Sequence, residues 1–98
     1  MGQWDWNPDW VISPGETLRD WMDEHGLVLG GRPLTSVLAS TCKDLDERDV
    51  QGVLDGKRRI TTVLACKLQV ATGISARIWL NLERAFRQGL EEGKIWNP

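Results

Sequence analysis

Residues 46–61, with the sequence DERDVQGVLDGKRRIT, decide the expected fold. Asp46 is a helix-capping residue, and Asp49 lies in the first turn, where a carboxylate favours the positive end of a helix. Apolar side chains then recur at helical spacing and predict a buried stripe, made of Val50, Val53 and Leu54. Gly56 is the expected left-handed stop. The stretch therefore predicts a short helix from Asp46 that is followed directly by three cations, Lys57, Arg58 and Arg59.

Four further helices are expected, all from an apolar stripe and three of them also from a capping residue and a glycine stop. Ser13-Pro14-Gly15-Glu16 is a capping box with proline at the first helical position, and Gly26 ends that helix. Another helix is expected over 34–42, and Thr61 and Ser75 cap two more that end at Gly73 and Gly93. The residues expected to face inward are Leu18, Trp21 and Met22, then Leu34, Val37, Leu38 and Thr41, then Leu64, Ala65, Leu68 and Ala71, then Ile78, Trp79, Leu82, Ala85, Phe86 and Leu90.

The expected architecture is an all-α bundle of five short helices. No stretch alternates apolar and polar residues for long enough to predict a strand of consequence, and residues 30–33 are expected to form a loop. We expect an irregular N-terminal arm over 1–12, one domain over 13–93 and a tail over 94–98. The three tryptophans of the arm, Trp4, Trp6 and Trp10, either pack back on the bundle or anchor a partner or a second protomer. Trp79 and Phe86 belong to the core or, alternatively, to a two-fold contact.

Composition and length exclude several classes of protein. The chain has 98 residues, 41% of them apolar and 27% charged, as in a soluble globular protein of one domain. No apolar run approaches the ~20 residues that cross a bilayer, and we expect a cytoplasmic protein with no membrane contact. Cys42 and Cys66 are expected as small buried hydrophobes, and His25 in a solvated or capping role. No catalytic, metal-binding or cofactor-binding motif is recognisable, so we expect neither an enzyme nor a cofactor.

The charges are distributed unevenly along the chain. The net charge is −2, but residues 1–26 hold six acids and one arginine, whereas residues 57–87 hold seven cations and one acid. Such a distribution presents a cationic surface to a polyanion, although an ordinary solvated helix face would look the same. We assign no site role to Arg84 and Arg87.

The order of the central helices is typical of a helix-turn-helix. The short helix over 34–42 is joined by a tight link to the helix that begins at Asp46. This second helix of the pair begins with polar residues and ends at glycine. In this motif the second helix presents its first turn to base edges in the major groove while its apolar stripe packs inward. The stripe leaves Glu47, Arg48 and Gln51 on the other face. Lys57, Arg58 and Arg59 follow where a phosphate backbone would run, so double-stranded DNA is the expected partner.

Three stretches resemble the lambda-repressor-like (XRE-type) helix-turn-helix domains, and within them the HigA-type antitoxins. They are residues 7–18, residues 50–61 and the segment Ile78–Glu83 (IWLNLE), which is similar to the FWLNLE signature of the family's last helix. The resemblance covers residues 7–90. It implies a DNA-binding antitoxin that represses its own operon as a homodimer and neutralises a RelE-like ribonuclease toxin. It places Glu47, Arg48, Asp49 and Gln51 at base-reading positions, Lys57 beside the phosphates, and Trp79 and Leu82 at structural positions.

The sequence departs from the family pattern around the helix-turn-helix. Residues 30–33 replace the usual opening of the second helix, and the turn at Lys43-Asp44 lacks its glycine and is one residue longer. The recognition helix is also acidic at its start, and carboxylates near phosphates repel them. Glu47 or Asp49 can accept a hydrogen bond from a cytosine amino group. The alternative is a degenerate helix-turn-helix protein, phage- or prophage-encoded, whose acidic helix binds another protein.

Overall fold

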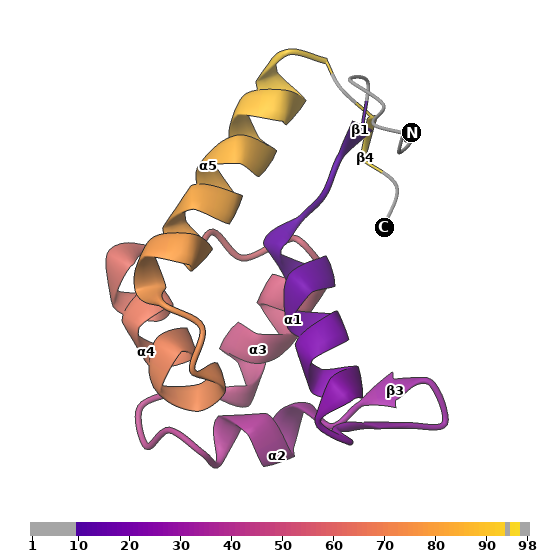
Figure 1. Ribbon diagram of the computed structural model, residues 1–98, viewed down its shortest axis with the longest axis vertical. Coiled ribbons are helices and arrows are strands. Elements are labelled where there is room, and N and C mark those ends of the chain that lie inside the picture. Colours follow the sequence, from indigo (N-terminus) through magenta and orange to yellow (C-terminus); the bar gives the residue numbers. More distant parts are fainter. Residues whose placement is uncertain (1–9, 94, 97–98) are drawn as a thin grey trace, which may run out of the picture.

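The computed structural model describes residues 10–93 and 95–96. Within them the chain is compact and mostly helical, as expected, and Figure 1 shows how the elements are arranged. The helices are α1 (Pro14–Glu24), α2 (Thr35–Ala39), α3 (Glu47–Leu54), α4 (Thr62–Thr72) and α5 (Ala76–Glu91). The strands are β1 (Trp10–Val11), β2 (Val28–Leu29), β3 (Arg32–Pro33) and β4 (Ile95–Trp96). Each described helix overlaps one of the five that the sequence predicts, and α2, expected from its apolar stripe alone, has no side-chain cap.

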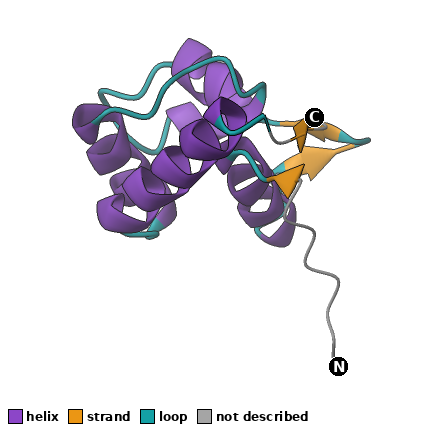
Figure 2. Ribbon diagram, turned by 90° about the horizontal axis from the view of Figure 1, so that it is seen from above, coloured by secondary structure: helices purple, strands orange, loops and turns teal. Residues whose placement is uncertain are grey.

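The expectation of an all-α chain is wrong in two places, and both strand pairs lie on one side of the helices (Figure 2). Strands β2 and β3 form an antiparallel hairpin where a loop was expected. Gly30 and Gly31 make its two-residue turn with φ of 60° and 79°, the conformation that a type I′ turn requires. Strands of two residues are too short to show any alternation, so a period-two pattern cannot predict them.

The second strand pair joins segments from opposite ends of the chain. Strand β1 pairs in parallel with β4, with Trp10 opposite Ile95 and Val11 opposite Trp96. The arm is therefore not irregular at Trp10–Val11, and residues 95–96 of the tail are part of the fold. Pairing between residues so distant in sequence leaves no local pattern. The prediction for the side chains of Trp4, Trp6 and Trp10 concerns features that lie outside the described part of the chain.

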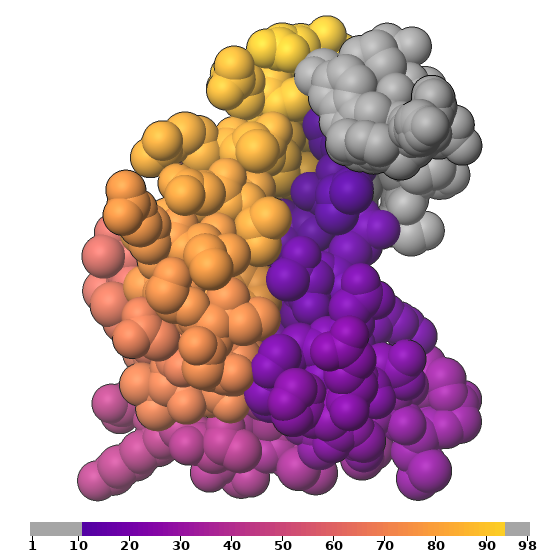
Figure 3. Space-filling view, viewed as in Figure 1, coloured from indigo at the N-terminus to yellow at the C-terminus, as the bar shows by residue number. Residues whose placement is uncertain are grey.

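The core lies between α1, α3, α4 and α5, with α2 and its flanking loops forming the base of the molecule in Figure 3. Its buried members are Leu18, Met22, Leu38, Leu45, Val50, Val53, Ile60, Leu64, Ala65, Leu68 and Trp79. Trp79 and Phe86 are buried within this chain, which confirms the core prediction for both. The Trp79 indole Nε1 has no hydrogen-bond partner among the described residues.

Several residues expected inside lie at the surface instead. Val37, Thr41, Ile78 and Ala85 are exposed. Helix α2 has only five residues, too few to carry the four-residue inward stripe expected of it. Cys66 is exposed as well, because it lies on the face of α4 opposite Leu64 and Leu68. His25 takes the expected capping position at the end of α1, where its ring stacks on Trp21 with the centroids 4.0 Å apart.

None of the described helices combines the length and apolar character that crossing a bilayer requires.

Candidate nucleic-acid interface

Helix α3 is fixed at its amino end and along its inner face. Asp46 adopts the extended conformation of an N-cap, and its Oδ1 accepts a hydrogen bond from the Arg48 backbone amide at 3.0 Å. Val50 and Val53 are buried in the core. At the other end of α3, the backbone of α1 passes so closely that a Cβ on Gly15 would lie 2.2 Å from the Val53 carbonyl oxygen. The predicted cap and stripe are therefore both present, and the inner face of α3 is closed by α1.

Helices α2 and α3 pack against each other and are joined by a compact link over residues 40–46. Leu45 is buried in the core and anchors that link to it. The Thr35 hydroxyl donates a hydrogen bond to Glu47 Oε1 at 3.0 Å and so ties the start of α2 to the start of α3. Because Thr35 is itself buried, this contact orients Glu47 toward α2. The first predicted base-reading residue therefore has a structural partner within the helix pair.

Arg48 and Gln51 occupy the exposed side of α3. Gln51 Nε2 donates to Asp55 Oδ1, one turn further along, at 3.0 Å. The Arg48 side chain is exposed and forms no hydrogen bond or ion pair with any residue that the structure describes. Of the four predicted base-reading residues, Arg48 is thus the one whose side chain is available without breaking a contact.

Asp49 and Arg58, which the sequence assigns to different roles, contact each other. Asp49 Oδ1 lies 3.2 Å from Arg58 Nη2, and the two side chains are 17% and 56% exposed. Asp49 is a predicted base-reading residue and Arg58 a predicted phosphate contact. The pair turns Asp49 away from the exposed side of α3 and neutralises part of the Arg58 charge.

The loop that carries the three cations is anchored at both ends. Gly56 has a φ of 72°, and the amides of Lys57 and Arg58 both donate to the Gly52 carbonyl, at 2.9 and 3.0 Å. At the other end, Ile60 is buried in the core. The loop is therefore short and fixed, with the side chains of Lys57 and Arg59 exposed on it.

Glu83 on α5 holds this loop in place. Its Oε1 accepts a hydrogen bond from the buried Ile60 amide at 3.2 Å, and its Oε2 pairs with Arg87 Nε at 2.5 Å. The sequence does not predict the contact of Glu83 with the Ile60 amide, which lies 23 residues upstream, although the spacing of Glu83 and Arg87, four residues apart on one helix, is typical of an ion pair. Arg87, to which no site role was assigned, is engaged in this pair.

Two open depressions flank α3 and its loop. One, of about 520 Å³, is lined by the hairpin, the start of α2, and Glu47 and Gln51 of α3. It brings Arg32 beside the exposed side of α3, a placement that the predicted loop over residues 30–33 does not include. The other, of about 920 Å³, is lined by the loop, the start of α4 and the outer side of α5. Arg59 and Arg84 lie on it together with Glu91 and Glu92, so its charge is mixed.

In comparisons with known proteins, no family model, no curated protein and no solved structure matches this chain.

The charges of the candidate interface balance. Residues 46–59 hold four acids and four cations, which are Asp46, Glu47, Asp49, Asp55, Arg48, Lys57, Arg58 and Arg59. All four acids have partners within the motif, since Asp46 caps α3, Glu47 accepts from Thr35, Asp49 pairs with Arg58 and Asp55 accepts from Gln51. The exposed cations of this segment that have no hydrogen-bond or ion-pair partner among the described residues are Arg48, Lys57 and Arg59.

Proposed function

We propose that this chain is a sequence-specific, double-stranded-DNA-binding repressor of the lambda-repressor-like type, with α3 in the major groove. The observation that carries the proposal is the placement of Arg48 on the exposed side of α3, one helix length before the anchored cationic loop. An arginine reads guanine by two hydrogen bonds to O6 and N7, and lysine and arginine beside the groove neutralise phosphates. Lys57 and Arg59 serve this second role. Repression of its own operon follows from the resemblance stated above.

The contacts within the motif divide the predicted site residues. Arg48 and Gln51 are assigned to base reading, since Gln51 has only a surface hydrogen bond on its own helix to exchange. Asp49 and Glu47 are assigned to holding the loop and α2, because their carboxylates already have partners there. Arg58 contributes less to phosphate binding than Lys57 and Arg59, because its ion pair with Asp49 compensates part of its charge.

A salt titration of binding to the DNA upstream of its own gene tests the proposal. Two to three phosphate contacts predict a log–log slope of affinity against salt of about −2 to −3 per protomer. The slope is shallow because the charges of the motif balance. Binding that ignores salt, or no binding to this duplex and to a pool of random duplexes at low salt, would refute the proposal.

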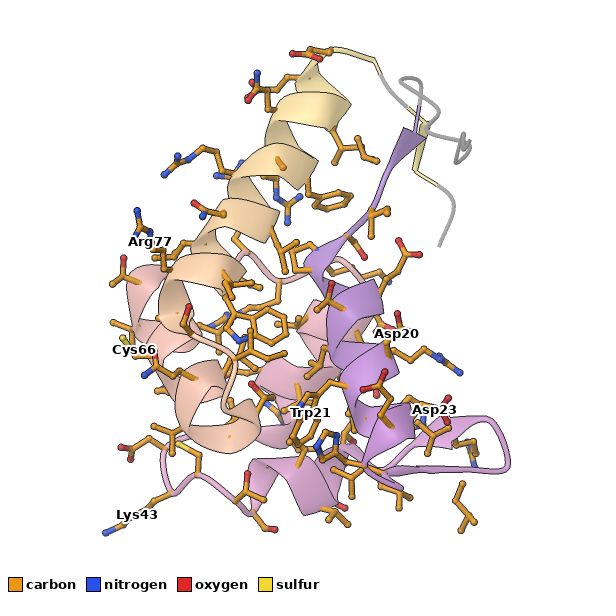
Figure 4. All side chains as sticks on the ribbon, in the orientation of Figure 1. Asp20, Trp21, Asp23, Lys43, Cys66 and Arg77 are labelled. Atoms are coloured by element: carbon orange, nitrogen blue, oxygen red, sulfur yellow. The ribbon has the colours of Figure 1, made fainter. Side chains whose placement is uncertain are left out.

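Two substitutions separate the roles of the cations. Arg48→Ala should reduce the preference for the specific duplex over a scrambled one by about 1–3 kcal/mol. Lys57→Ala should weaken both duplexes equally and reduce the salt slope by about one. Arg77→Ala is the matched control, because Arg77 is an exposed arginine on α5 (Figure 4) and lines neither depression. Loss of specificity in this control would contradict the assignment.

A second candidate function is a protein-binding module that uses the same face. The balanced charge of the motif and the depression lined by Glu47 and Gln51 favour it. A toxin bound by an antitoxin would be such a partner, so both functions can belong to one chain. Glu47→Lys should disrupt a complex formed on this face, whereas it should strengthen binding to DNA. The opposite signs of the two effects distinguish the candidates.

A further inference from the structure

The hairpin of β2 and β3 is held at its base and at its tip. At the base, the Leu27 amide donates to the Met22 carbonyl and the Leu34 amide donates to the Leu27 carbonyl, both at 2.7 Å. At the tip, Arg19 Nη2 on α1 donates to the Gly31 carbonyl at 2.8 Å. The hairpin is therefore a fixed projection beside the end of α1, as Figure 1 shows.

This fixed hairpin presents one charged side chain, that of Arg32. Arg32 lies on β3 opposite Leu29 of β2, and its side chain is exposed. It forms no hydrogen bond or ion pair with any side chain in the described part of the protein. The depression of about 520 Å³ places it beside Glu47 and Gln51 of α3. Glu47 is turned toward α2 by its bond to Thr35, so Arg32 is available to an anion from outside the chain.

We propose that Arg32 binds a phosphate of the DNA backbone on the side of α3 opposite to the loop of Lys57 and Arg59, an inference that rests on the proposed function. A helix with its side chains is about 10–12 Å across, and the major groove is about 12 Å wide. Elements beside α3 therefore meet the two backbones that border the groove. In Figure 1 the hairpin lies below α3, whereas the chain that follows α3 crosses above it toward α4. The cationic loop then meets one backbone and Arg32 the other.

The position of Arg32 favours a phosphate over a base edge. Arg48 and Gln51 occupy the exposed side of α3 itself, and Arg32 lies beside that side. The exposed Ser36 at the start of α2 lines the same depression, and serine hydroxyls and arginine side chains both bind phosphate oxygens. The family resemblance assigns no role to Arg32, because residues 30–33 depart from the family pattern.

Salt titrations of the wild type and of Arg32→Ala, with the duplex from upstream of the gene, test the inference. Loss of one phosphate contact should make the log–log slope of affinity against salt shallower by about 0.9. Between about 50 and 200 mM salt, the wild type should therefore lose about 3.5 times more affinity than Arg32→Ala. Arg77→Ala is the matched control, because it removes the same charge from an exposed position that lines neither depression. This control should keep the wild-type slope.

A gain of charge on the hairpin gives the converse test, which cannot succeed through unfolding. Leu29 is 72% exposed, and residues directly opposite each other in a hairpin present their side chains on the same face. Leu29→Lys should therefore steepen the slope by about 0.9, and in Arg32→Ala it should restore the slope that was lost. Circular dichroism checks that each variant remains folded.

Replacing single phosphates of the duplex by neutral methylphosphonates locates the contact. At the phosphate that Arg32 binds, the replacement should weaken binding of the wild type but not of Arg32→Ala. The phosphate that depends in the same way on Lys57 should lie on the other strand, across the major groove. A wild-type slope in Arg32→Ala, or contacts of Arg32 and Lys57 on the same strand, overturns this inference and leaves the proposed function standing. Absence of binding by the wild type to every duplex refutes the proposed function, and this inference with it.

Discussion

Replacing Gly15 by alanine should destabilise the chain by about 3 kcal/mol or more, at the upper end of the usual cost of overpacking. The added Cβ would lie 2.2 Å from the Val53 carbonyl oxygen and 2.8 Å from that of Leu54. A contact of this kind needs more than 3 Å, so α1 and α3 would have to separate by about 1 Å. The obstacles are backbone atoms of a helix, which cannot rotate away. A gap of that size forfeits a quarter to a half of the dispersion energy of the contacts it opens, here those between α1 and α3.

The sign of this effect is informative, because helix propensity alone predicts the reverse. Alanine in place of a helical glycine ordinarily stabilises by up to about 1 kcal/mol. At about 4–8 °C per kcal/mol for a domain of this size, Gly15→Ala should lower the Tm by roughly 12–24 °C. Urea unfolding followed by tryptophan fluorescence gives the free energy directly. Gly26→Ala is the control, since Gly26 has a φ of 72° and nothing within 4 Å, and its cost is the left-handed backbone alone, about 1–2 kcal/mol. If Gly15→Ala costs no more than Gly26→Ala, the close crossing of α1 over α3 is wrong.

Substitutions of Glu83, Asp49 and Thr61 test the contacts that hold the candidate interface and the helix that follows it. Glu83→Ala should cost about 2–3 kcal/mol in urea unfolding because it leaves a buried amide unpaired, whereas Glu83→Gln should cost less because its oxygen still accepts. Asp49→Asn should free Arg58 and, if the proposed DNA binding is correct, steepen the salt slope by about one while changing stability by less than about 1 kcal/mol. Thr61→Ala should cost about 1 kcal/mol through loss of the α4 cap, and Thr62→Ala, beside it, should cost far less. Equal losses at positions 61 and 62 would contradict the assignment of the cap.

Most of the helices could be predicted because their amino ends are determined by capping residues within one turn of the helix. Glu16 accepts a hydrogen bond from the Ser13 amide at 3.1 Å, as its capping-box position predicts. Thr61 and Ser75 accept from the amides of Leu64 and Ile78 in the same way. Each of these contacts spans three residues, so the information needed to predict it lies within one helical turn.

The features that sequence reasoning missed depend on contacts over longer distances. The pairing of β1 with β4 joins the two ends of the chain, and the bond from the Ile60 amide to Glu83 spans 23 residues. The hairpin is the exception, because Gly30-Gly31 between two short segments is itself typical of a type I′ turn. Reading that dipeptide as a loop also removed Arg32 from the predicted site. The exposure of Cys66 was missed because residue type was weighed without its position on the helix.

The acidic start of α3 opposes DNA binding, but contacts within the motif reduce this effect. An unpaired carboxylate in the groove would repel the phosphates, but Asp46, Glu47 and Asp49 each have a partner within the motif. Each contact also fixes one part of it: the start of α3, the orientation of α2 and the position of the cationic loop. These carboxylates can therefore serve to stabilise the motif rather than to contact its ligand. Coulomb repulsion still acts beyond these contacts at low salt and is screened over about 10 Å at 0.1 M. It follows that the acids should lower affinity for all duplexes alike, and that sequence preference should depend on Arg48 and Gln51.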